Sequence, residues 1–353
     1  MKIPILTDTH QGIRNSADTL MNYQNEFYEK VFFPYCKEHN VTQIIHGGDY
    51  YDHRKYINFK ALNSNRKNFL EPLRQMGISM DIIPGNHDVY YKNTNDLCSL
   101  KELLGYYTGN INIIMKPIVQ NYGGLDMAML PWVNNENYAE SIKFIQNCKA
   151  SWLLGHLELS GFEMMKGVMN HGGMEASLFN RFEKVLTGHF HTKSDRGNVS
   201  YLGSSMEFTW ADAHDPKFFH VIDTETRVLE QIRNPISLFQ KIFYDDKEND
   251  YANFDFKALE KKFIKIIIVN RQDTYAFDKF VDKVQMENIH ELKIAEDFNE
   301  FLGESVDDEN ISFEDTTNLL NTYIDSIDTQ LDKEKIKNLV HNLYVESLNQ
   351  DIC

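Results

Sequence analysis

Long apolar runs are missing from this chain of 353 residues. No stretch of about 18 apolar residues occurs, which excludes the pattern of a transmembrane helix. The sequence also passes from Met1 and Lys2 directly into a strand-like segment, without the apolar core of a signal peptide. Cysteine is scarce, and its four residues lack C-x-x-C spacing. We therefore expect reduced thiols, no membrane association and a cytoplasmic location.

Positive charge is also scarce, since the net charge is −16. Residues 1–235 carry 23 basic and 26 acidic residues, whereas residues 236–353 carry 13 and 26. The acidity therefore lies mainly in the last third, and we expect weak affinity of the isolated chain for a polyanion. One local cluster of basic residues is an exception to this acidity. It is either a nucleic-acid contact or a solvated helix face with core tyrosines. It comprises Arg54, Lys55, Lys60, Arg66 and Lys67, with Tyr50, Tyr51 and Tyr56 nearby.

Polar motifs that follow apolar runs are the most informative feature present. The runs at residues 3–7, 42–46, 80–83, 152–154 and 185–187 are short and bounded by glycine or proline, which predicts core strands. Open α/β sheets bind ligands at the carboxyl ends of their strands. The motifs that follow are Asp8-Thr9-His10, Gly48-Asp49, Gly85-Asn86-His87-Asp88, Gly155-His156 and Gly188-His189-Phe190-His191.

These motifs contain three aspartates, one asparagine and five histidines, of which two carboxylates, one amide oxygen and four imidazoles are the candidate metal ligands. Such a mixed set without cysteine suits Mn²⁺, Fe or Zn²⁺ at a catalytic site. Each motif alone is weak, but their joint order is not expected by chance. Seven ligands are too many for one ion, so the sequence predicts two ions that share a bridging carboxylate.

The series D-x-H, G-D, G-N-H, H and G-H-x-H resembles the calcineurin-like metallophosphoesterase superfamily. Within it the chain is similar to the double-strand-break-repair nucleases of the bacterial SbcD type. Phage-like motifs occur at residues 130–132 (LPW), 155–162 (GHLELSGF), 187–192 (TGHFHT), 201–204 (YLGS) and 215–219 (DPKFF). Through them the chain is also similar to a phage-like subgroup that includes the nuclease subunit of the T-even phage recombination endonuclease. The resemblance covers residues 1–235 well and the remainder in outline. It implies an α/β fold, a four-layer α/β/β/α sandwich.

The resemblance also implies a set of site residues. The first metal would be held by Asp8, His10, Asp49 and His191. The second would be held by Asp49, Asn86, His156 and His189, with Asp49 bridging. His87 would act on the phosphate as the general acid, and Asp88 would orient its imidazole. The implied cofactors are two divalent cations, Mn²⁺ with Mg²⁺ as the alternative.

One position departs from the family pattern. Cellular nucleases of this family often carry a second catalytic histidine three residues after the shared aspartate, where this chain has Asp52. His53 follows and is a candidate catalytic residue, with a plain loop residue as the other interpretation. Asp52 with nearby Arg54 is also similar to the G-D-x-V-D-R-G loop of protein phosphatases.

Four segments are expected along the chain. Residues 1–235 form the nuclease domain, and residues 236–300 form a small α+β capping domain with strands at 265–269 and 289–294 around a helix at 275–286. Residues 301–311 form an acidic linker. Residues 312–353 form two amphipathic helices that either dock on the catalytic domain or bind another protein.

The resulting hypothesis is an Mn²⁺-dependent DNA nuclease with 3′→5′ exonuclease activity on duplexes and endonuclease activity on single strands. By resemblance, its partners would be DNA, an SbcC-type ABC ATPase bound by the C-terminal helices, and a second copy of the chain. Residues 58–75 and 95–106 are the candidate dimer surface. A phosphatase or nucleotide phosphodiesterase acting on a small or protein substrate is the main alternative, and a non-catalytic scaffold is the other. The phage-like motifs would place the protein in a host cytoplasm.

Overall fold

The computed structural model describes residues 1–107, 109–165 and 168–296, together with positions 324, 333, 335 and 337. The chain divides into two units, Met1–Leu302 and Gly303–Cys353. The predicted acidic linker and almost all of the predicted C-terminal helix pair lie outside the described residues.

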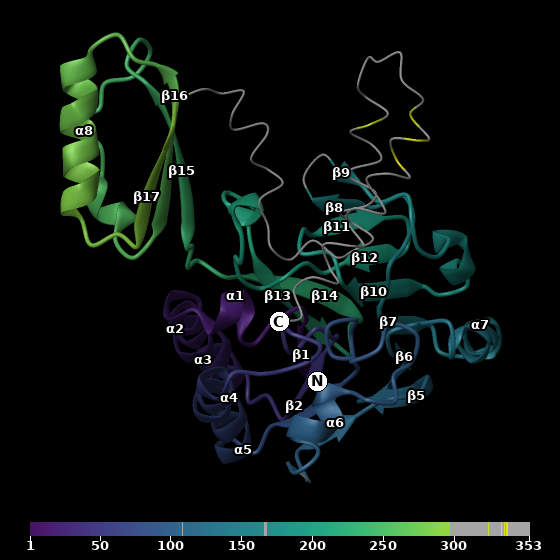
Figure 1. Ribbon diagram of the computed structural model, residues 1–353. Coiled ribbons are helices and arrows are strands. Elements are labelled where there is room, and N and C mark those ends of the chain that lie inside the picture. Colours follow the sequence, from purple (N-terminus) through teal and green to yellow (C-terminus); the bar gives the residue numbers. More distant parts are fainter. Residues whose placement is uncertain are drawn as a thin grey trace. The chain divides into compact units, whose positions relative to one another are not determined.

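Two six-stranded sheets form the body of the first unit (Figure 1). The first has the order β14-β13-β1-β2-β3-β4, in which β1 to β4 are parallel and β13 and β14 are antiparallel. Its strands are β1 (Lys2–Leu6), β2 (Gln43–His46), β3 (Ser79–Ile82), β4 (Ile111–Ile113), β13 (Phe218–Asp223) and β14 (Val228–Arg233).

The second sheet has the order β11-β12-β10-β7-β6-β5 and is parallel except at its two edges. All five runs predicted as strands are strands, and they are central in one sheet or the other. The strands are β5 (Ile118–Tyr122), β6 (Leu125–Leu130), β7 (Trp152–His156), β10 (Lys184–Gly188), β11 (Ser194–Arg196) and β12 (Val199–Tyr201), and a hairpin of β8 (Glu163–Met165) and β9 (Val168–Met169) follows β7.

The register of these strands brings their carboxyl ends level. In the first sheet Leu6 pairs with His46, and His46 pairs with Ile82. In the second sheet Gly188 pairs with His156. The loops that begin after β1, β2, β3, β7 and β10 therefore start at matching heights, which is the edge where a site is expected.

Three apolar cores show that the body has four layers. Ile3, Ile45 and Leu186 belong to the core between the two sheets. A second core joins the first sheet to α2 (Asp18–Phe27), α3 (Phe33–Glu38) and α5 (Glu71–Gln75), and a third joins the second sheet to α7 (Tyr138–Asn147). Because the central strands are covered on both faces, most of their inner positions are apolar. The predicted α/β/β/α sandwich is confirmed.

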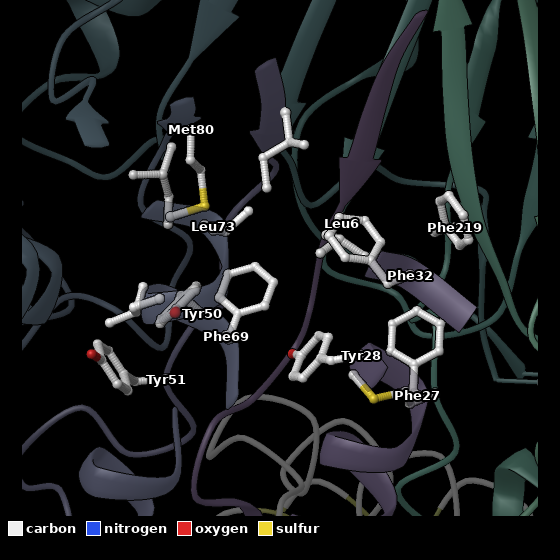
Figure 2. Packing of buried hydrophobic residues seen from close by; sticks show 14 of the residues in the cluster. Leu6, Phe27, Tyr28, Phe32, Tyr50, Tyr51, Phe69, Leu73, Met80 and Phe219 are labelled. Atoms are coloured by element: carbon white, nitrogen blue, oxygen red, sulfur yellow. The ribbon is translucent and has the colours of Figure 1, made fainter. Parts of the chain in front are cut away.

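The helices beside the first sheet form two nearly continuous rods, each interrupted by a π-helical turn. Their packing rests on aromatic rings, with Phe69 lying between Tyr28 and Tyr50 in Figure 2. The helices are α1 (Ile13–Ser16), α2 (Asp18–Phe27), α3 (Phe33–Glu38), α4 (Phe59–Asn65) and α5 (Glu71–Gln75), with turns at Tyr28–Phe32 and Arg66–Leu70, and α6 (Ser99–Leu104) precedes β4.

A separate small core belongs to the predicted capping module. Three parallel strands, β15 (Phe239–Asp245), β16 (Phe263–Asn270) and β17 (Glu291–Ala295), pair side by side. Helix α8 (Thr274–Met286) packs on them through Phe277, Phe280 and Val284. The predicted strand–helix–strand order is present. The third strand of this sheet, β15, was not predicted from the sequence.

We predict that Phe69→Ala lowers the free energy of unfolding by about 3–5 kcal/mol, because the ring is fully buried and its removal leaves a cavity. The measurement is a denaturant titration. The matched control is Tyr275→Ala, since Tyr275 is 71% exposed and its truncation costs less than about 0.5 kcal/mol. Equal losses for the two variants would contradict this packing.

Candidate metal centre

The loops that leave the strand ends carry strained backbone at four predicted ligands. Asp8, His10, Asp49 and His189 have φ of 51°, 43°, 52° and 97°. Non-glycine residues rarely adopt this left-handed region, and such strain clusters at functional sites.

Glycines allow the loops to approach one another closely. A Cβ on Gly85 would lie 2.2 Å from Asp49 Oδ1, and a Cβ on Gly188 would lie 2.0 Å from Thr7 Oγ1. Gly48 has φ of 100°, and a Cβ there would lie 2.6 Å from His156 Nδ1. No side chain fits at these three positions while the ligand loops keep their places.

The first ligand group brings together Asp8, His10 and His191, whose donor atoms lie within 4.8 Å of one another. The two Nε2 atoms of His10 and His191 are 3.0 Å apart. The Asp8 carboxylate is held in place because the N–H of His189 donates to Oδ1 at 3.0 Å and Thr7 Oγ1 donates to Oδ2 at 2.7 Å. Donor atoms from the loops after β1 and β10 thus converge on one point.

The second group brings together Asp49, His156 and His189. Asn86 Oδ1 joins it, at 3.1 Å from His156 Nε2 and 2.9 Å from His189 Nδ1. Asp49 Oδ2 lies 3.3 Å from His156 Nε2 and 3.8 Å from His10 Nε2. Asp49 therefore stands between the two groups, where a bridging ligand would be.

The donor set fits two divalent cations. Buried imidazole nitrogens that approach within 3.0 Å of one another need a shared proton or cation to offset the repulsion of their lone pairs. Oxygen and imidazole donors without sulfur match a catalytic transition-metal site.

Two histidines of the site have pKa values raised by the carboxylates around them. Burial alone lowers the pKa of His10, but Asp52, Asp49 and Asp8 outweigh it and raise the pKa to about 9. Burial likewise opposes protonation of His156, whereas Asp49, Asp8 and the carbonyl of Gly47 raise its pKa to about 9. The carboxylates around His10 and His156 therefore favour cationic charge at this place.

The pKa values of His191, His189 and Asp49 are lowered instead. Burial and neighbouring His10 lower the pKa of His191 to about 3, and burial with the adjacent His156 lowers the pKa of His189. The pKa of Asp49 is held well below its usual range because the attraction of His156, His87 and His10 exceeds the cost of burial. Neutral imidazoles and an ionised carboxylate are the ligand forms that a metal requires.

Contacts behind the ligands fix their orientation. His156 Nδ1 donates to the carbonyl of Gly47 at 2.9 Å, which leaves Nε2 to face the site. His10 Nδ1 lies 3.3 Å from Asp52 Oδ1. Lys217 is buried and donates to the carbonyl of His191 at 3.0 Å. Such supporting groups set the tautomer and angle of a ligating histidine.

His87 lies beside the first group. Its ring meets that of His10 edge to face, with centroids 4.9 Å apart. Its backbone N–H donates to Asp49 Oδ1 at 2.8 Å, and its Nδ1 donates to the carbonyl of Asp52 at 2.6 Å. Nδ1 therefore keeps its proton, and Nε2 is the atom available for proton transfer.

The expected role of Asp88 is corrected by these contacts. Its carboxylate accepts the backbone N–H groups of Gly85, Tyr50 and Tyr51 at 2.9–3.1 Å, while His87 is oriented by Asp52. Asp88 therefore ties the loop after β2 to the loop after β3. Burial and Asp49 raise its pKa to about 7.

His53 lies at the rim of the site. Its Nε2 is 3.6 Å from Asp52 Oδ2, and its side chain is 31% exposed. His53 belongs to none of the three metal-compatible groups found among the described residues. The third of these groups consists of His10, Asp49 and His87.

Three supporting residues were not predicted. Trp132 packs against His156 and His189, with ring centroids 5.9 and 5.5 Å away. Phe208 packs against His10 and His191, each at 5.7 Å. No sequence signal identifies Phe208. Trp132 follows a Leu-Pro pair and Lys217 follows Asp-Pro, which are distinctive sequences without a predicted role.

Comparisons with known proteins agree with this geometry. The profile of the calcineurin-like phosphoesterase family matches residues 1–201. Exonuclease subunit 1 of Enterobacteria phage T4 is 31% identical over 98% of this chain and 99% of its own length. The SbcD subunit of nuclease SbcCD from Staphylococcus saprophyticus is 22% identical over 74% of this chain and 75% of its own, and that from Staphylococcus epidermidis is 22% identical over 65% and 67%.

The chain therefore belongs to the calcineurin-like phosphoesterase family. It is a metal-dependent phosphodiester hydrolase, and its relatives place it beside the nucleases of that family. Among the described helices, none has the length and apolar character needed to cross a membrane.

We predict that Mn²⁺ affinity rises between pH 6.5 and about 9, because the metal must displace the protons of His10 and His156, whose pKa values are about 9. Calorimetric titration in two buffers of different ionisation heat measures the number of protons released on metal binding. We expect about two protons for two ions at pH 7. An affinity independent of pH, without proton release, would contradict the assignment.

Stability of the metal-free chain should change in the opposite direction. Both pKa values lie above the ordinary value of about 6.5, so protonation of His10 and His156 stabilises the fold fully below that pH. This contribution is lost as pH rises toward about 9. Denaturant titrations in EDTA across this pH range measure the loss.

Proposed function

We propose that this chain is an Mn²⁺-dependent DNA nuclease that holds two cations through the seven predicted ligands. The observation that carries the proposal is the meeting of both ligand groups at Asp49, with His87 beside them. Relatives named as an exonuclease subunit and as nuclease subunits support DNA as the substrate. The expected activities are 3′→5′ exonuclease on duplexes and endonuclease on single strands.

The assignment of ligands follows the two groups. Asp8, His10, Asp49 and His191 would hold one cation, and Asp49, Asn86, His156 and His189 the other. When bound, two such cations polarise a phosphodiester and lower the pKa of water between them. Mn²⁺ is proposed over Mg²⁺ because four of the seven ligands are imidazoles, whereas Mg²⁺ prefers oxygen.

His87 is the proposed general acid. Burial, opposed by Asp49, and the charge of nearby His10 lower its pKa in the metal-free chain. A phosphodiester anion beside Nε2 would raise that pKa again, since a nearby negative charge favours the imidazolium. The carbonyl of Asp52 holds the ring so that Nε2 can protonate the leaving 3′-oxygen.

A metallophosphatase with a small or protein substrate is the second candidate. The phosphatase-like pair of Asp52 and Arg54 favours it, because the buried Asp52 carboxylate lies against His10 as part of the site. The acidic balance of the chain also favours a substrate other than a polyanion.

We predict that His87→Ala slows Mn²⁺-dependent shortening of end-labelled duplex DNA by about 10²–10⁴-fold, since it removes the proton donor. The measurement compares product ladders over time. His171→Ala is the matched control, because His171 is exposed and outside the ligand groups, and it should retain full activity. Hydrolysis of a small phosphomonoester without cleavage of any DNA by the unsubstituted chain would favour the phosphatase.

A partner subunit is proposed for the C-terminal residues. The relatives are named as subunits, two of them of SbcCD, which supports a complex with an SbcC-type ATPase. A homodimer through residues 58–75 and 95–106 is also proposed. Phe59 and Tyr106 within those segments are 85% and 88% exposed, which supports an interface there.

We predict that deletion of residues 311–353 abolishes co-purification with the ATPase subunit and leaves basal nuclease activity intact. The helices predicted there carry the apolar stripes that would fill a groove on the partner. A truncated chain that still co-purifies with the ATPase would contradict the prediction.

A further inference from the structure

Two stacked rings stand at the rim of the metal centre. His53 and Tyr56 have ring centroids 4.5 Å apart and an interplanar angle of 21°, and Tyr56 Oη lies 3.4 Å from His53 Nε2. Tyr56 is 60% exposed, whereas Tyr50 and Tyr51 of the same segment are fully buried in the core. The stack is therefore held from one side and open on the other.

Asp52 connects this stack to the reactive groups. One carboxylate oxygen lies 3.6 Å from His53 Nε2, and the other lies 3.3 Å from His10 Nδ1. The backbone carbonyl of the same residue accepts the Nδ1–H of His87 at 2.6 Å. A single residue thus separates the stacked rings from a proposed ligand and from the proposed acid.

The surrounding segment has an unusual charge for this chain. Residues 53–70 contain five basic residues and no acidic residue, although the whole chain has a net charge of −16. Lys55 is exposed and immediately precedes Tyr56. An exposed aromatic face beside cationic side chains is the combination that binds single-stranded nucleic acid, with bases on the ring and phosphates on the cations.

We propose that the His53–Tyr56 pair is a stacking platform for an unpaired nucleobase next to the scissile phosphodiester. This rests on the proposed nuclease function and specifies its substrate as a frayed or single-stranded DNA segment. Lys55 contacts a flanking phosphate. Because His53 already holds the Tyr56 ring, little side-chain freedom is lost when a base binds. His53 then acts by positioning Tyr56 and takes no part in proton transfer.

The test uses the full chain in EDTA, where a metal-dependent enzyme does not cleave. Fluorescence anisotropy measures binding of a labelled twelve-nucleotide oligothymidylate and of an oligomer of the same length whose central residues lack bases. Tyr56→Ala should weaken binding of the first by about 5- to 150-fold, the range for loss of one stacked base, and leave the second unchanged. Tyr56→Phe keeps the ring and should bind as the unsubstituted chain does.

Tyr275→Ala is the matched control, since Tyr275 is 71% exposed on α8 and should affect neither oligomer. Equal weakening for both oligomers by Tyr56→Ala, or a loss with Tyr56→Phe as large as with Tyr56→Ala, would overturn the platform. A change in oligomeric state on gel filtration of Tyr56→Ala would also overturn it, because Tyr56 would then belong to an interface between copies.

Failure of the platform is distinguishable from failure of the nuclease. Mn²⁺-dependent DNA cleavage without any preference for base-containing oligomers overturns the platform alone. Base-dependent binding that Tyr56→Ala abolishes, in a chain that cleaves no DNA, supports the platform and overturns the nuclease activity of the isolated chain.

Discussion

The buried carboxylate of Asp49 is the point on which the rest of the site depends. It lies 3.3 Å from His156 and 3.8 Å from His10, and it accepts the backbone N–H of His87 at 2.8 Å. Its negative charge is tolerated in the interior because imidazoles from three loops surround it. Asp49 follows β2, which lies between β1 and β3, so one side chain reaches the groups that follow both neighbouring strands.

The fold supplies the rigidity that this arrangement requires. Two sheets covered by helices hold the strand ends level, and the loops that leave them have little freedom to move apart. The left-handed backbone at Asp8, His10 and Asp49 is locally unfavourable. Glycine is required where a side chain would collide, and ordering a glycine costs conformational entropy. The buried cores on both faces of each sheet stabilise the fold enough to offset that strain.

Much of this architecture was predictable because its signals are local. Short apolar runs between glycines identified the five central strands, and the motifs after them identified the residues that meet. Contacts between distant segments were not predictable. Asp88 turned away from His87 because three backbone N–H groups from the β2 and β3 loops compete for it. Phe208 packs on His10 and His191, and Lys217 binds the carbonyl of His191, across long sequence separations. Tyr50 is fully buried and Tyr56 is 60% exposed, although only five residues separate them.

The measurement that tests the central claim most directly is the number and coupling of Mn²⁺ ions in the loaded chain. Equilibrium dialysis with metal analysis gives the number, and low-temperature electron paramagnetic resonance reports whether the ions interact. A carboxylate that bridges two ions about 3.5–4 Å apart predicts two Mn²⁺ per chain with an exchange-coupled spectrum. A single ion, or two ions with an uncoupled six-line spectrum, would contradict a centre built around Asp49.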